Sequence, residues 1–125
     1  MMFVWTAFLG WAAVLFLAAG IGIPYLARTL HLKRFWLHYV LGFLIPAVAL
    51  LHAWLPMSAG RARSTDMIGL LLATAALFVM VSQAAVGITL RSAQGPDRFR
   101  LRRTHFLIMT VMVLLVGGHI YLNRA

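Results

Sequence analysis

The chain has no cysteine and only two acidic residues among its 125 amino acids. Without cysteine it can form no disulfide, no thiolate metal site and no iron–sulfur cluster, and it has no C-x-x-C-H motif for covalent haem attachment. An ordinary soluble domain has about a quarter charged residues, whereas this chain has 10% charged and 63% apolar residues. This composition excludes an ordinary soluble domain and indicates a membrane protein.

Four long stretches contain no Asp, Glu, Lys or Arg, and each is long enough to cross a hydrocarbon layer of about 30 Å as a helix. They predict membrane spans at residues 3–27, 35–57, 67–90 and 104–123. We therefore expect an all-α fold, a transmembrane four-helix bundle that forms a single membrane domain over residues 1–125. The first stretch lacks the basic start of a signal peptide, so we interpret it as a span.

The net charge of +9 comes from Lys and Arg residues that lie between the apolar stretches. This placement favours membrane topology and contact with anionic lipid over nucleic-acid binding. Eight of the eleven basic residues lie in 28–34 and 91–103, and the other three are Arg61, Arg63 and Arg124. The positive-inside rule then predicts that both termini lie on the outer side. We expect a multi-pass protein of a prokaryotic cytoplasmic (inner) membrane.

Four of the five histidines lie inside the spans, in two pairs with the same spacing. His38 and His52 are fourteen residues apart in the second span, and His105 and His119 are fourteen apart in the fourth. Fourteen helical residues extend about 21 Å, and they make four turns at the 3.5 residues per turn of a left-handed bundle. Both histidines of one span therefore point at the same neighbour. The spacing predicts two bis-histidine sites stacked across the membrane.

Alternating spans make the second and fourth parallel, which pairs His38 with His105 near the cytoplasmic face and His52 with His119 near the outer face. Imidazoles are costly to bury in hydrocarbon unless they have partners, and the spans contain no acid to provide one. Iron ligated by two neutral imidazoles removes this cost, and bis-histidine ligation suits electron transfer. We therefore expect two non-covalent haem b groups.

Basic residues lie close to the predicted cytoplasmic site. Arg34 is one turn before His38, and Arg102 and Arg103 directly precede His105. Their positions suit the carboxylates of a haem. An alternative interpretation is that these arginines only set the topology and contact lipid headgroups.

Other residues around the histidines have simpler expected roles. Gly42, one turn beyond His38, would leave room beside a bound ring. Ile45 and Met112 lie midway between the histidines of their spans and are expected to fill the space between the two sites. We interpret the fifth histidine, His31, as a surface residue of the first connection.

Two parallel helices that each carry H-x13-H, in the second and fourth of four spans, resemble a known arrangement. It is the haem-binding four-helix bundle of the cytochrome b subunit of quinol–cytochrome c oxidoreductases. Small bacterial di-haem membrane cytochromes and the membrane part of ferric reductases are similar. The resemblance covers nearly the whole chain and implies that the axial ligands are His38, His52, His105 and His119.

These observations predict a di-haem cytochrome that carries electrons between the membrane faces. Its expected partners are lipid, redox subunits of a larger membrane complex and the quinone pool, with quinone as a further possible ligand. It would serve either as a subunit of an oxidoreductase complex or as a small quinone-linked oxidoreductase. A chlorophyll-binding antenna protein is an alternative, because chlorophyll takes one axial ligand. A membrane transporter or assembly factor is another.

Overall fold

The residues that the computed structural model describes, 2–30, 36–58 and 67–122, are almost entirely α-helical. These residues form four helices and no strand, and each helix is long and apolar enough to cross a membrane. The helices are α1 (Met2–Thr29), α2 (Trp36–Ser58), α3 (Met67–Ser92) and α4 (Gly95–Leu122). The prediction of an all-α fold with four membrane-spanning helices is therefore confirmed.

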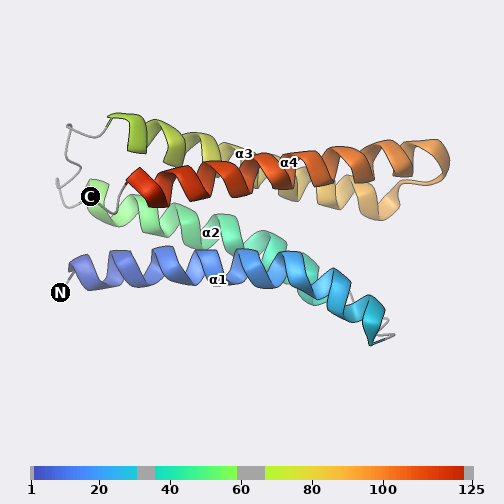
Figure 1. The fold of residues 1–125 in the computed structure, drawn as a ribbon, viewed down its shortest axis with the longest axis horizontal. Coiled ribbons are helices and arrows are strands. Elements are labelled where there is room, and N and C mark those ends of the chain that lie inside the picture. Colours follow the sequence, from blue (N-terminus) through green and yellow to red (C-terminus); the bar gives the residue numbers. More distant parts are fainter. Residues whose placement is uncertain (1, 31–35, 59–66, 123–125) are drawn as a thin grey trace. The chain divides into compact units, whose positions relative to one another are not determined.

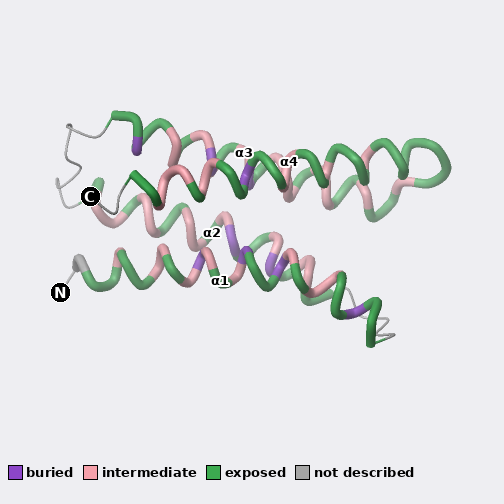
Figure 2. The backbone as a smooth tube through the Cα atoms, viewed as in Figure 1, coloured by how far each residue is buried: buried purple, intermediate pink, exposed green. Residues whose placement is uncertain are grey.

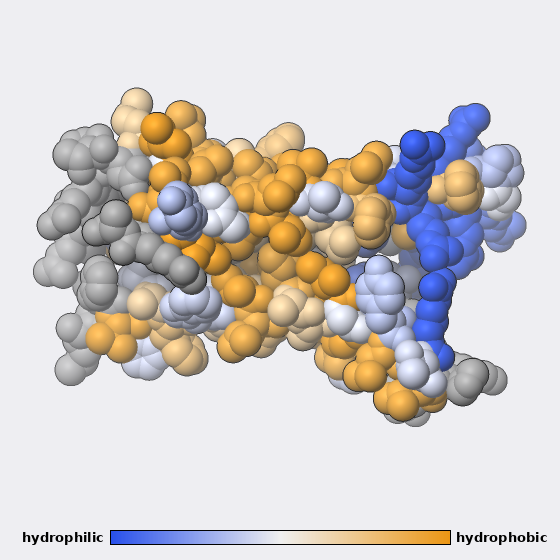
Figure 3. Space-filling view, in the orientation of Figure 1, coloured by the Kyte–Doolittle hydropathy of each residue, from blue (hydrophilic) through white to orange (hydrophobic). Residues whose placement is uncertain are grey.

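Helix α4 begins nine residues before the span predicted from the sequence. The sequence predicts a connection over residues 91–103, but only Ala93 and Gln94 lie between α3 and α4. Gly95 has a φ of +56°, which favours glycine, and Pro96 follows in the first turn, where the missing N–H costs nothing. The basic residues near this turn therefore lie on helices, at the hydrophilic end of the α3–α4 pair in Figure 3.

The chain divides into two compact units, Met1–Ala62 and Arg63–Ala125, and each is described by itself. In each unit, two helices pack side by side and run in opposite directions, α1 with α2 and α3 with α4 (Figure 1). We call these units the first and second hairpins. The sequence analysis treated the whole chain as one membrane domain.

Small and branched apolar residues pack between the two helices of the first hairpin, where the buried positions lie (Figure 2). Ala13 and Leu17 of α1 are buried, as are Leu41 and Ile45 of α2. A Cβ atom added to Gly20 would lie 3.5 Å from Cδ1 of Ile45, so the helices are already in close contact there. Small residues on α1 thus allow the approach of larger side chains from α2.

The second hairpin follows the same pattern. Gly69, Ala76 and Met80 of α3 are buried, and so is Met112 of α4. A Cβ atom added to Gly118 would lie 3.5 Å from Cδ1 of Leu72, which is ordinary van der Waals contact. In the second hairpin, too, a small residue of one helix contacts a larger residue of the other, here with the glycine on α4 and the leucine on α3.

Large apolar side chains cover much of the outer surface of the helices (Figure 3). Phe8, Phe78 and Leu114 are examples, with exposed fractions of 60%, 73% and 70%. Apolar surface of this extent is unfavourable in water and favourable against lipid. The packing and the helix lengths together support a multi-pass membrane protein.

We predict that Ala76→Leu destabilises the second hairpin by about 1–3 kcal/mol, the usual cost of overfilling a packed interior. Ala76 is buried, whereas Ala85 of the same helix is exposed. Ala85→Leu is therefore the matched control and should change little. Thermal loss of helical circular dichroism in detergent measures both. Equal stability of the two variants would contradict the assignment of Ala76 to the packed face.

Candidate functional site

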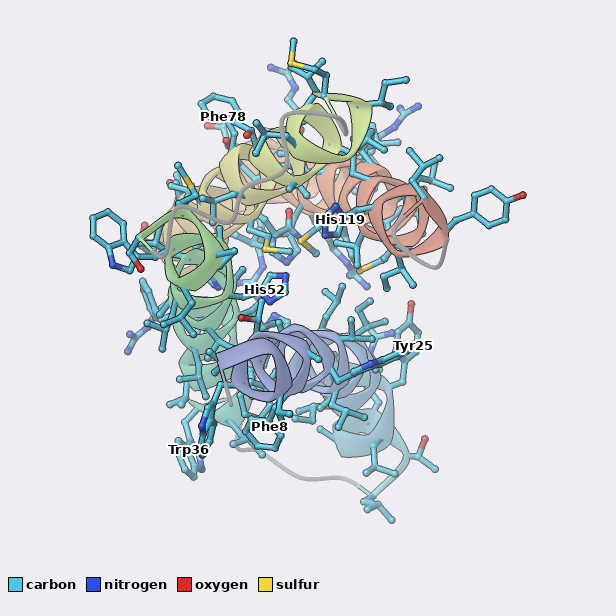
Figure 4. The ribbon with its side chains drawn as sticks, turned by 90° about the vertical axis from the view of Figure 1, so that its left-hand side faces the viewer. Phe8, Tyr25, Trp36, His52, Phe78 and His119 are labelled. Carbon is cyan, nitrogen blue, oxygen red and sulfur yellow. The ribbon has the colours of Figure 1, made fainter. Side chains whose placement is uncertain are left out.

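The two histidines of the first hairpin both contact the backbone of α1. The Nδ1 atom of His38 lies 2.8 Å from the carbonyl oxygen of Gly20, and Nδ1 of His52 lies 2.8 Å from that of Thr6. Both rings are half-buried. Figure 4 shows the His52 ring extending from α2 toward α1. Both histidines of this helix face one neighbouring helix, as their spacing predicts.

These contacts fix the chemistry of each imidazole ring. A carbonyl oxygen can only accept a hydrogen bond, so Nδ1 must carry the hydrogen and donate it. In a neutral imidazole the other nitrogen, Nε2, then keeps its lone pair. Each ring that makes this bond is oriented by the backbone and presents Nε2 as a base or as a metal ligand.

The spacing of the acceptors on α1 matches the spacing of the histidines. Moving fourteen residues along α2 from His38 to His52 corresponds to moving fourteen residues back along α1, from Gly20 to Thr6. The two helices therefore stay in register over four turns at 3.5 residues per turn. Both contacts form because the acceptors repeat with the same period as the donors.

Gly10 explains how the His52 ring reaches its acceptor. In a helix, the carbonyl of Thr6 lies beneath the side-chain position of the residue four places later, which is Gly10. A Cβ atom at Gly10 would lie only 2.9 Å from Cε1 of His52 and 3.2 Å from its Nδ1. The absence of a side chain at this position is therefore what admits the ring.

The second hairpin holds its histidines against α3 in a similar way. Nδ1 of His119 lies 3.2 Å from the carbonyl oxygen of Gly69. The His105 ring packs beside Gly87, where an added Cβ atom would lie 3.5 Å from Cε1 of His105. Both rings are half-buried, and His119 is seen within this hairpin in Figure 4.

Gln83 lies at the position of α3 that corresponds to His105 in the register of this hairpin. Counting fourteen residues forward from Gly69 and fourteen back from His119 leads to Gln83 and His105. Gly87 follows Gln83 by four residues, just as Gly10 follows Thr6. The side-chain Oε1 of Gln83 is buried and accepts no hydrogen bond from the described part of the chain.

The positions halfway between the histidines are filled by buried residues. Ile45 lies seven residues from His38 and from His52, and Met112 lies seven from His105 and from His119. Both are buried, as are the corresponding positions Ala13 and Ala76 on the partner helices. Ile45 and Met112 thus lie inside their hairpins, and that they fill the space between two haem sites stays a prediction.

The remaining predicted site residues differ in their surroundings. A Cβ atom at Gly42 would meet nothing within 4 Å, so the space beside it is open. Arg102 and Arg103 are exposed on α4, while Arg34 lies outside the described residues, as does His31. A contact of these arginines with a haem stays a prediction. So does the pairing of α2 histidines with α4 histidines, which joins the two hairpins.

The sequence analysis missed the acceptors on α1 and α3. These residues are uncharged and common in membrane helices, so their types give no signal. Which carbonyl a ring can reach depends on the register between two helices, and the residue types of one helix do not reveal it.

Among the described residues, no three His, Cys, Asp or Glu side chains gather into one cluster that could hold a metal ion. His38, His52 and His119 instead lie one at a time, each against a backbone carbonyl of the neighbouring helix. The chain matches no protein-family model and has no significant similarity to any curated protein or solved structure.

We predict that Gly10→Ala displaces the His52 ring from the Thr6 carbonyl, because the new methyl group would overlap the ring. Gly22→Ala on the same helix is the control, since a Cβ atom there meets nothing within 4 Å. Nitrogen-15 NMR of the imidazole Nδ1–H reports the bond. The signal should change in Gly10→Ala and persist in Gly22→Ala, and an unchanged Gly10→Ala spectrum would contradict the proposed role of Gly10.

Proposed function

We propose that this protein carries electrons across a membrane through two non-covalent haem b groups. One is held by His38 and His105, and the other by His52 and His119. Haem iron with two imidazole ligands supplies a one-electron carrier that has no open coordination position. The protein's part is to hold the ligands in register and to exclude water.

The orientation of the imidazoles is the observation that carries this proposal. His38, His52 and His119 each donate Nδ1–H to a backbone carbonyl, which leaves Nε2 for a metal. A metal-bound histidine typically donates its other N–H to such an acceptor, which fixes the ring and raises the basicity of the ligand. Histidines that only linked helices together would not need to repeat this arrangement at a fourteen-residue period.

The number of ligands also fits haem. The four nitrogen atoms of a porphyrin complete the coordination of its iron, so two protein ligands suffice for each group. A zinc site would need three or four protein ligands, and the described residues of each hairpin hold only two histidines, fourteen residues apart. Neutral imidazole ligands also need no acidic partner, and the predicted spans contain no Asp or Glu.

The absorption spectrum of the purified protein tests this proposal. We expect sharp bands in the reduced-minus-oxidised spectrum. Far-red bands that do not respond to redox reagents would instead show a chlorophyll protein. A colourless, iron-free preparation would contradict the proposal and favour a transporter or an assembly factor.

We predict that His52→Ala removes one haem and His105→Ala removes the other, because each substitution deletes one ligand of a different pair. Difference spectra with haem quantification measure this, and each variant should keep about half of the haem signal of the unmodified chain. Loss of the same haem in both variants would show that His52 and His105 form a pair, which would contradict the proposed pairing.

We also propose that the four helices form one bundle in a prokaryotic cytoplasmic membrane, with both termini on the outer side. The support is the concentration of arginine near the α3–α4 turn, since basic residues favour the cytoplasmic side. This orientation places His38 and His105 near the cytoplasmic face.

The absence of native cysteine allows a direct test of this orientation. We predict that Gln94→Cys, which introduces a single thiol at an exposed turn position, is labelled by a membrane-impermeant maleimide only after the cytoplasmic face is opened. Labelling of intact cells would contradict the orientation. The cysteine-free parent chain provides the background.

The stretches of sequence between the four predicted spans are too short to form a flavin or an iron–sulfur domain. We therefore propose that electrons enter and leave through redox subunits of a larger complex or through the quinone pool. Arg34, Arg102 and Arg103 would contact the carboxylates of the cytoplasmic haem, and Gly42 would give space beside His38.

A further inference from the structure

Pro24 lies at a position of α1 that affects the acceptor of His38. In a regular helix the carbonyl of Gly20 accepts a hydrogen bond from the N–H of the residue four places later. That residue is Pro24, which lies inside α1 and has no N–H. The Nδ1–H of His38 donates to this carbonyl at 2.8 Å. His38 therefore takes a hydrogen-bond acceptor that Pro24 leaves without its usual helical donor.

The acceptor of His52 differs in this respect. The Thr6 carbonyl faces the N–H of Gly10, a residue inside the same helix, so it accepts from the helix and from His52 together. A carbonyl oxygen has two lone pairs and can do both. The Thr6 carbonyl oxygen is then shared by two donors, so it is a weaker acceptor for each of them. The two histidines of α2 thus have the same distance to their acceptors but different kinds of acceptor.

We propose that Pro24 is a positioning residue that strengthens the His38 Nδ1–H bond and thereby sets the two haem sites apart in reduction potential. This inference rests on the proposed function. A stronger bond from Nδ1–H gives the ring more imidazolate character and makes Nε2 a stronger donor to iron. A stronger donor stabilises ferric over ferrous iron. Pro24 therefore lowers the potential of the haem that His38 binds.

Proline also bends helices, and α1 bends over its C-terminal part in Figure 1. The bend alone would move residues without changing the acceptor strength at one histidine. A test must therefore separate the electronic effect from the change of helix shape. The chain offers a matched control in Pro46, which lies inside α2 between His38 and His52.

The experiment compares Pro24→Ala with Pro46→Ala in the full chain. Pro24→Ala restores an N–H to the Gly20 carbonyl, so His38 must share its acceptor. Pro46→Ala restores an N–H to the Gly42 carbonyl, which is not an acceptor of the His38 or His52 ring contacts. In a redox titration, Pro24→Ala should raise the reduction potential of one haem and leave the reduction potential of the other haem unchanged. Pro46→Ala should produce no such selective rise.

The titration also identifies the haem that shifts. It should be the one that is lost in His38→Ala. Haem dissociation from that site should become up to about tenfold faster in Pro24→Ala, the lower end of the effect expected when an outer partner of a ligand is weakened. Unchanged potentials in Pro24→Ala, or a rise of the other haem, would overturn the proposal.

Nitrogen-15 NMR of the haem-free chain provides an independent readout. The Nδ1–H proton of His38 should shift upfield in Pro24→Ala, as expected for a weaker hydrogen bond, and that of His52 should stay in place. If the protein bound no haem, the proposed function would fail while this shift would still establish the effect of Pro24 on the bond. If it bound two haems and the His38 signal did not move, the role of Pro24 alone would be wrong.

Discussion

The hydrogen bond from an imidazole Nδ1–H to a helix carbonyl is the interaction on which the rest of this structure depends. In hydrocarbon a polar ring without a partner costs several kcal/mol, roughly 2–7 by the usual transfer scales. No acidic side chain lies in the apolar spans, and the backbone of a neighbouring helix provides the acceptor instead. A helix carbonyl can serve because it has a second lone pair. The bond holds the ring and leaves Nε2 for a ligand.

This requirement constrains the packing of both hairpins. At two positions the neighbouring helix has a glycine beside the ring, Gly10 beside His52 and Gly87 beside His105. The helices must also keep their register. The small buried residues Ala13 and Ala76 lie at the levels halfway between the histidines. At Gly10 and Gly87 the small residues of α1 and α3 leave space for the rings of α2 and α4.

Much of the fold was predictable from composition. Charge-free stretches of about twenty residues or more permit little besides membrane helices, because no other open structure satisfies its backbone in lipid. The start of α4 was not predictable in this way, since Gly95 and Pro96 are turn residues that also begin helices well. The basic residues after them joined the helix, although their charge had suggested a connection.

The site was only partly predictable. Histidine spacing identified the rings and their common face, because a residue type that is rare in spans gives a clear period. The acceptors were missed because any residue has a carbonyl, and which carbonyl is accessible depends on the register between two helices. The Gly20 carbonyl is an example, since it is exceptional only through the N–H that Pro24, four residues later, lacks.

Electron paramagnetic resonance of the oxidised, purified protein tests the central claim most directly. Two bis-imidazole sites predict two low-spin ferric signals that together account for two iron atoms per chain. A high-spin ferric signal would mean an open coordination position and would contradict bis-histidine ligation. An iron-free protein would contradict the assignment of the four histidines as ligands altogether.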